Sequence, residues 1–425
     1  MSVQQSDSAA VLARLRDVIK NDPILSGFLS AAITGTSHAA RAPQAAPQAA
    51  PQAAPQRTKT GRPGAERSAD GVLVCGKKEV MSVFANVDGN CTVKGYGARS
   101  AKCFGEFFLG LDDGPEDRAQ SSAINAAISA LTGPDGFRMG LEHTRAALAV
   151  PSDPPKKTED VSTDMLAGVA AELFGIPDGE LITAGKTGLH TLDHGVCPGD
   201  CAPLSGYIFR PEPDEMITRY GPIPGHLLLE QTKTLIARAR AAASKPAGIL
   251  TQVPFDTSPP AQDDLLCRAL VGVMMGLLPT ADGNFVAAYD ELHGSADFIT
   301  ARDAIMALGD GVDFDGARAV PAGPVCAAMQ ESPQPEAVWR TAAKDHFIGD
   351  TNPVAVKAGD MIIVSIENAT REDLSAGIQD VSAIFGGDRS ATPQPLHGCP
   401  GFAVSMGLLY GAVTAMLQDA AARQG

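Results

Sequence analysis

The chain has 425 residues, of which 44% are hydrophobic and 20% charged, a composition typical of a globular protein with enough apolar material for a large core. Its formal net charge of −15 argues against a nucleic-acid partner, because phosphate binding needs a basic face, and against attraction to an anionic membrane surface. Eight cysteines are ordinary intracellular usage rather than a disulfide framework, so we expect a cytoplasmic protein.

The N-terminal part is predicted to lie outside the folded domain. An extension over 1–40 contains a short amphipathic helix at 8–35, and residues 41–56 repeat Ala-Ala-Pro-Gln units. This low-complexity sequence has nothing to bury, which predicts a flexible, polyproline-II-like linker over 41–69. The polar N-terminus has no signal-peptide pattern, so we expect no stable membrane anchor. The folded domain is predicted to span 70–425.

That domain is predicted to be mainly α-helical with small β-sheets. Helices are expected at 116–133, 160–174, 226–244 and 262–278, and strands at Val72–Val74, Met81–Ala85 and Met361–Ile366. The helix at 262–278 is apolar on nearly all sides, which predicts that it is buried. Asp263 and Asp264 favour its N-terminus, and Pro279 is expected to kink or end it.

A group of possible metal ligands precedes the middle of the chain. His190, His194, Cys197 and Cys201 are closely spaced, and imidazoles and thiolates of this kind can hold zinc. Because Pro198 and Gly199 fall within the group, the alternative is an irregular packed loop whose spacing is accidental.

The segment His397-Gly398-Cys399-Pro400-Gly401 lies directly before the apolar run 402–417. Proline is preorganised for a first helical turn, which places Cys399 at the entrance of a helix. The helix N-terminus stabilises a thiolate, and thiolate is an axial ligand of haem that favours O–O cleavage. Gly398 and Gly401 would let a flat macrocycle approach the backbone. The alternative is a buried structural cysteine before a core helix.

Four upstream motifs favour the haem interpretation. In order, they are Val338-Trp339-Arg340-Thr341-Ala342-Ala343, Val356-Lys357-Ala358-Gly359-Asp360, Asn368-Ala369-Thr370-Arg371-Glu372-Asp373 and Phe385-Gly386-Gly387-Asp388-Arg389. This order resembles the C-terminal third of a cytochrome P450, where a propionate-binding Arg precedes a hairpin, a turn and a Phe-Gly approach to the Cys ligand. The resemblance covers about 70–420. It includes the helix at 264–280 and Phe108-Leu109-Gly110-Leu111-Asp112, which looks like the segment before the family's C helix.

The resemblance implies a P450-like fold with a long central helix over haem b, iron protoporphyrin IX. It makes Cys399 the ligand of the iron, Arg340 and His397 the donors to the propionates, and Gly398 and Gly401 neighbours of the cofactor. It also implies a small hydrophobic substrate, and a ferredoxin or flavin reductase as the electron donor of a monooxygenase.

The sequence departs from the family pattern at several positions. The Glu-x-x-Arg pair falls on Ala327 and Gln330, and the Phe and second Gly of the Cys loop fall on Thr392 and Pro395. The C helix lacks an obvious Trp/His-x-x-x-Arg motif. The acid and alcohol that relay protons to dioxygen fall on Leu278 and Pro279, with Thr280 displaced by one residue.

Three functions remain open on this basis. Thr280 and Asn284 are the candidate distal residues, since an amide can hydrogen-bond a peroxide oxygen without donating a full proton; the alternatives are a helix C-cap for Asn284 and a turn after Pro279 for Thr280. The missing proton relay favours a haem-thiolate enzyme that uses peroxide or rearranges a lipid hydroperoxide. The breadth of the family favours a reductase-dependent monooxygenase. A non-catalytic haem-binding protein is the third possibility.

Overall fold

The computed structural model describes residues 64–68, 71–175, 198–213, 215–241, 248–250, 259–309, 311–350, 352–388, 390–391 and 394–423. The helix expected at 8–35 and the repeat at 41–56 lie outside the described residues.

Helices dominate the described chain, as predicted. In sequence order they are α3 (Lys77–Ala85), α4 (Lys94–Ser100), η2 (Phe108–Gly110), α5 (Pro115–Ser129), α6 (Gly133–Ala149), α7 (Thr158–Phe174), α10 (Pro198–Phe209), α11 (Glu215–Tyr220), α12 (Pro222–Ala241), η4 (Pro260–Gln262), α14 (Asp263–Gly294), α15 (Phe298–Leu308), α16 (Phe314–Arg318), α17 (Ala322–Glu331), α18 (Ile366–Ser375), η5 (Ser382–Phe385) and α19 (Phe402–Ala422).

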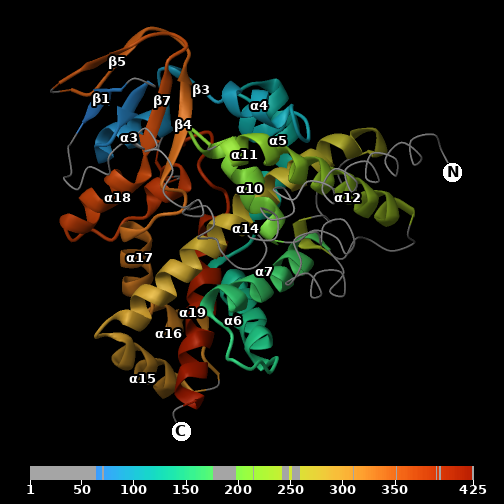
Figure 1. The fold of residues 1–425 in the computed structure, drawn as a ribbon, viewed down its shortest axis with the longest axis vertical. Helices are drawn as coiled ribbons and strands as arrows, with labels where there is room; N and C mark the ends of the chain where they lie inside the picture. Colours follow the sequence, from blue (N-terminus) through green and yellow to red (C-terminus); the bar gives the residue numbers. More distant parts are fainter. Residues whose placement is uncertain are drawn as a thin grey trace, which may run out of the picture.

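The strands form two small sheets. They are β1 (Ala65–Arg67), β2 (Val72–Val74), β3 (Cys91–Thr92), β4 (Ala337–Ala342), β5 (His346–Ile348), β6 (Val354–Val356) and β7 (Met361–Ser365). The larger sheet has the order β1-β2-β7-β4-β3, in which only β2 and β7 run parallel, and β5 pairs with β6. A turn is present at 357–360, where it joins β6 to β7, but these two strands belong to different sheets, so the hairpin expected around 356–360 is wrong. Figure 1 shows the larger sheet with α3 and α18 at one end of the molecule and the helical part at the other.

α14 is the central helix of the helical part (Figure 1) and packs against α7, α10, α12 and α17. The helix continues through Pro279. Of the two predicted effects of this proline, a kink or an end of the helix, the end is therefore wrong. Burial explains the difference. Leu270, Met274 and Leu278 are completely buried, and this packing outweighs the local cost of about 3 kcal/mol for a proline inside a helix.

One helix in the described part of the chain, Pro260–Gly294, is long and apolar enough to cross a membrane by length and composition alone. Its 18-residue apolar window is 56% buried inside the protein, as in a core helix.

Two other local predictions are wrong. Residues 81–85, expected as a strand, belong to α3, since a short apolar run fits either element and here only Val80, Val83 and Phe84 face the core. The Asn368–Asp373 segment, expected as a turn, lies in α18, which the Ser365 hydroxyl caps by accepting from the Asn368 N–H at 3.3 Å.

α19 and α6 lie side by side (Figure 1), and their backbones approach each other closely at glycines. A Cβ added at Gly140 would stand 2.1 Å from the Leu408 carbonyl oxygen, and one added at Gly411 would stand 2.1 Å from the Phe137 carbonyl oxygen. Only hydrogen atoms fit there, so the glycines set the distance between the two backbones. This contact fixes the helix that follows the Cys399 loop.

Candidate functional site

The Cys399 loop connects η5 to α19. The Cys399 N–H donates to the Phe385 carbonyl at 2.7 Å, which ties the loop to the end of η5. Gly386 and Gly387 have φ of +74° and +114°, and a Cβ at Gly387 would stand 2.9 Å from Pro395. The Phe-Gly approach to the cysteine therefore needs glycine for both its backbone and its packing.

The helix after the loop begins later than expected. Its first residue is Phe402 and its N-cap is Gly401, so Cys399 lies three residues before the helix rather than at its entrance. At Gly401 an added Cβ would stand 3.6 Å from the Cys399 Sγ and 3.3 Å from a methyl carbon of Ile128. A glycine here keeps a side chain away from the sulfur. Gly398, the other predicted neighbour of the cofactor, is buried beside Cys399.

Arg340 lies on β4 and is 9% exposed. Its guanidinium donates to the Tyr96 hydroxyl at 2.8 Å and to the Trp339 carbonyl at 2.8 Å, and it lies 5.4 Å from the Tyr96 ring centre. Within the described residues no Asp or Glu side chain forms an ion pair with it. Tyr96, which sequence reasoning missed, therefore positions a buried cation that has no anionic partner.

His397 lies next to this cation. Burial, together with the positive charge of Arg340, lowers the pKa of His397 to about 4, so the imidazole is neutral at pH 7. A hydrogen bond with the backbone of Leu111 engages the ring, while its Nε2 atom is buried and has no partner in the described structure. The site thus contains a buried cation without a carboxylate partner and a buried ring nitrogen without a hydrogen-bond partner, within the described residues.

These two groups fit a carboxylate-bearing cofactor. A buried guanidinium is normally paired with an anion, and an anion beside His397 would favour the protonated ring, whose Nε2–H can donate to a negatively charged oxygen. Haem propionates are groups of this kind, and Cys399 lies two residues from His397 in the same loop. The residues present are therefore compatible with haem.

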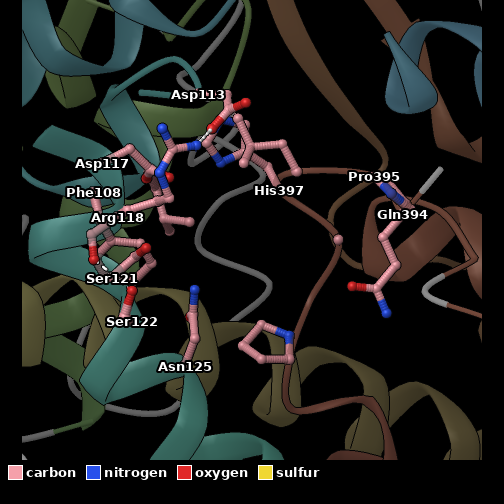
Figure 2. A pocket seen from close by; sticks show the side chains of 14 residues that line it. Phe108, Asp113, Asp117, Arg118, Ser121, Ser122, Asn125, Gln394, Pro395 and His397 are labelled. Carbon is pink, nitrogen blue, oxygen red and sulfur yellow. Dashed lines mark hydrogen bonds and ion pairs between the residues drawn. The ribbon is translucent and has the colours of Figure 1, made fainter. Parts of the chain in front are cut away.

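A cavity of about 300 Å³ opens beside the loop. Figure 2 shows its two walls, with α5 side chains that include Ser121 and Asn125 on one side and Gln394 and Pro395 of the Cys399 loop on the other. His397, Gly398 and Pro400 also line it, as do Asp113, Asp117 and Arg118 from the start of α5 and the turn before it. The order η2 then α5 matches the expectation that Phe108–Asp112 precedes a C helix.

The two distal candidates both lie on α14. The Thr280 hydroxyl is half-buried and donates to the carbonyls of Gly276 at 2.5 Å and Leu277 at 3.1 Å. A Cβ added at Gly276 would meet nothing within 4 Å, whereas one at Gly272 would stand 2.5 Å from the Phe107 ring. The helix is therefore open to one side at Gly276, whose carbonyl accepts from Thr280, and because α14 continues through Thr280 the alternative of a turn after Pro279 is wrong.

Asn284 is in the middle of α14 and 4% exposed, so the alternative of a helix C-cap is wrong as well. Its amide nitrogen donates to the carbonyls of Thr280 at 2.8 Å and Gln334 at 3.2 Å, and its amide oxygen accepts from the Gln334 N–H at 3.3 Å. The side chain connects α14 to the segment before β4.

At the position of the family's Glu-x-x-Arg pair, the structure shows a neutral substitute. Gln330, which is completely buried, donates to the carbonyls of Ile378 at 2.8 Å and Asp380 at 3.1 Å. Lys77 binds the same region through Asp373 at 2.5 Å and Asp380 at 2.9 Å. α17 is thus held against the segment that leads to the Cys399 loop without the usual ion pair.

The suggested zinc ligands give no site in the described part of the chain. Residues 190–197 lie outside the described residues, and Cys201 is completely buried in α10. No group of three or more His, Cys, Asp or Glu side chains within the described ranges is placed to hold a metal ion.

Comparisons with known proteins find the fold but no close relative. No protein-family model matches the chain, and no curated protein sequence matches it significantly. Solved structures do. Ligand-free CYP164A2 of Mycobacterium smegmatis is similar at a TM-score of 0.60 with 15% identity, over 82% of this chain and 83% of that one. A mutant of P450 EryK in complex with erythromycin B gives 0.60 with 13% identity over 83% and 84%, and CYP109B1 of Bacillus subtilis 0.55 with 14% identity over 83% and 87%.

The mainly helical chain, the small sheets, the long α14 and the cysteine loop before α19 agree with these similarities, and the predicted fold class is confirmed. The chain has the cytochrome P450 fold, at 13–15% sequence identity to the solved structures named above.

Proposed function

We propose that this protein is a haem-thiolate oxidoreductase acting on a small hydrophobic substrate, with Cys399 as the axial ligand. The observation that carries the proposal is the pair formed by Arg340 and His397. The first is a buried guanidinium without a carboxylate partner, and the second has a buried Nε2 without a partner, two residues before Cys399. A propionate would pair with Arg340, and its negative charge would favour the protonated form of His397, whose Nε2–H could then donate to it and hold the cofactor beside the thiolate.

Haem bound by a thiolate supplies oxidation chemistry with dioxygen or with peroxides. The residues of α14 would form the environment on the side of the haem opposite Cys399. Leu278 is completely buried and Pro279 has no side-chain donor, so α14 presents no carboxylic acid at the turn before Thr280. Asp282 accepts from the Ser162 hydroxyl at 2.6 Å and is thereby held toward α7.

This distal environment favours peroxide over dioxygen. Dioxygen needs delivered protons and two external electrons, whereas a peroxide already carries those electrons and needs only a hydrogen-bond donor. We infer that the Thr280 hydroxyl is the better candidate for that donor, because it bonds only to carbonyls of its own helix and can rotate. Asn284, the other predicted donor, would have to release Gln334 to act.

A reductase-dependent monooxygenase is the second candidate function. Solved structures with this fold include the P450 monooxygenase TamI with tirandamycin C bound, at a TM-score of 0.54 and 18% identity. In that case a ferredoxin or flavin reductase would supply electrons. A cytoplasmic location stays a prediction from the sequence.

Two measurements test the proposal. Reduced protein treated with carbon monoxide should give the absorbance band of a thiolate-ligated haem. Purified haem-loaded protein should then turn over a fatty-acid hydroperoxide without any reductase, and Thr280→Val should slow it by about 10²-fold or more, the usual size of an acid–base contribution. Activity only with NAD(P)H and a reductase would establish the monooxygenase instead. Haem binding with neither activity would leave a haem-binding protein.

A further inference from the structure

Polar side chains lie in a row along the α5 wall of the cavity, and the proposed function so far gives them no role. Asp117, Ser121 and Asn125 are spaced four residues apart, which places them on one face of the helix, and all three line the cavity that His397 and Pro400 also line. In the family that the sequence resembles, this helix carries a Trp/His-x-x-x-Arg motif. None of the three residues here is basic.

These side chains have no partner in the described structure. Asp117 is 4% exposed and Ser121 6%, and neither side chain forms a hydrogen bond or ion pair within the described residues. The Asn125 Oδ1 is buried without a partner. Arg118, the one cation among the α5 residues lining the cavity, pairs instead with Asp113 at 2.6 Å on the rim, where the side chains are 61% and 66% exposed.

An ionised carboxylate at Asp117 would be a buried charge without a hydrogen-bond or ion-pair partner among the described residues, and burial of this kind favours the protonated form. Burial, with the negative charge of Asp113 adding to it and Arg118 opposing it, raises the pKa of Asp117 to about 6. The other charged and titratable groups nearby are His397 across the cavity and, behind it, Asp112 and Arg340.

We propose that Asp117 is the α5 partner of a haem propionate and binds it as the protonated acid, donating its O–H to the propionate oxygen. The inference rests on the proposed haem-thiolate function and deepens it. Ser121 and the Asn125 amide supply two further neutral donors on the same wall. An O–H···O⁻ bond between an acid and a carboxylate is among the short, strong hydrogen bonds, so a neutral Asp117 can replace a cation at this place. The negative propionate further favours the protonated form.

The consequence is that haem retention should depend on the proton at Asp117. As the pH rises the proton is lost, two carboxylates face each other, and haem should dissociate faster. An amide at the same position would keep a donor at every pH. Removal of the side chain would lose the donor at every pH.

The experiment measures haem transfer from the loaded protein to an excess of apomyoglobin, followed by absorbance between pH 5 and pH 9. Wild type should show a dissociation rate that rises across this range. Asp117→Asn should be slow and independent of pH, and Asp117→Ala should be fast throughout, by roughly tenfold to a hundredfold relative to wild type at pH 5. Asp113→Asn, on the exposed rim, is the matched control and should follow wild type.

The outcomes separate this inference from the proposed function. If wild-type protein binds no haem with a thiolate-type carbon monoxide band, both fail. If it binds haem in that way but Asp117→Asn keeps the wild-type pH profile, or wild type shows no rise, only the role of Asp117 is overturned. If Asp117→Asn releases haem faster than wild type at every pH, Asp117 acts as an anion toward a cationic group, and the inference is overturned as well.

Discussion

The Asn284 side chain and the Gln334 backbone form a reciprocal pair of hydrogen bonds, with the amide nitrogen donating to the Gln334 carbonyl at 3.2 Å and the amide oxygen accepting from the Gln334 N–H at 3.3 Å. They join residues that are 50 positions apart and connect α14 to the segment that leads into β4. Since β4 carries Arg340, this pair links the central helix to the cation that we assign to a propionate.

Asn284→Leu should therefore destabilise the protein by about 1–3 kcal/mol, because it leaves the two polar backbone groups of Gln334 without these partners. The measurement is the urea midpoint of the haem-loaded protein. Thr280→Val, which leaves the pair intact, is the control and should change the midpoint less. A midpoint equal to that of wild type, combined with loss of hydroperoxide turnover, would contradict the positioning role and restore Asn284 as the distal donor.

Cys399→Ala should abolish the thiolate-type carbon monoxide spectrum, because no other side chain of the loop can supply the sulfur. Cys326→Ala is a suitable control, since that thiol is half-buried between α17 and α19 and faces the Tyr410 hydroxyl at 3.9 Å. Its spectrum should match wild type. A Cys399→Ala protein that keeps the band would show that the iron ligand is elsewhere.

Arg340→Ala should lower haem affinity by roughly tenfold to a hundredfold while helix content stays the same, since one hydrogen bond to a charged group contributes about 1.5–3 kcal/mol. Haem titration and far-ultraviolet circular dichroism measure the two effects. Arg371→Ala is the control, because that side chain is 42% exposed on α18. Unchanged haem affinity in Arg340→Ala would show that this β4 cation does not bind the cofactor.

Gly411→Ala should destabilise the fold by about 1–3 kcal/mol or more, because the new Cβ would stand 2.1 Å from the Phe137 carbonyl oxygen and force α19 away from α6. Gly276→Ala is the matched change inside another helix, where the Cβ would meet nothing within 4 Å, and the better helix propensity of alanine should leave stability equal or slightly higher. Denaturation midpoints of the haem-free chains compare them. Equal midpoints would contradict the close backbone contact.

The stability of the haem-free chain should fall between about pH 4 and pH 6 through Asp117. Its pKa in the folded chain, about 6, is above the unfolded value of 3.8, so the folded state binds this proton more tightly. The contribution is therefore complete below pH 4 and is lost as the pH rises through 6. Asp117→Asn should match wild type at pH 4 and be more stable at pH 7.5, by up to about 3 kcal/mol. Thermal melting at the two pH values measures this, and an equal difference at both would contradict it.

The sequence alone determined the features that depend on neighbours along the chain. The order of Arg340, the turn at 357–360, the glycines 386–387 and the cysteine loop could be predicted, because each is a short motif with its own backbone or turn requirement. The buried character of α14 also followed from its apolar sequence. The start of α19 was misplaced by two residues, since proline at a first helical turn is a preference and here Gly401 is the N-cap of the helix.

The tertiary structure decided what depends on residues far apart. Local sequence preference predicted that the central helix ends near Pro279. In the structure, packing against α7, α10 and α17 stabilises the helix as far as Gly294. Tyr96 meets Arg340 across 244 positions, and Asp117 shares a cavity with His397, neither of which any local pattern indicates. The reason is physical. A side chain's charge state and partners are set by burial and by groups brought together through folding, and these are properties of the packed chain rather than of a segment.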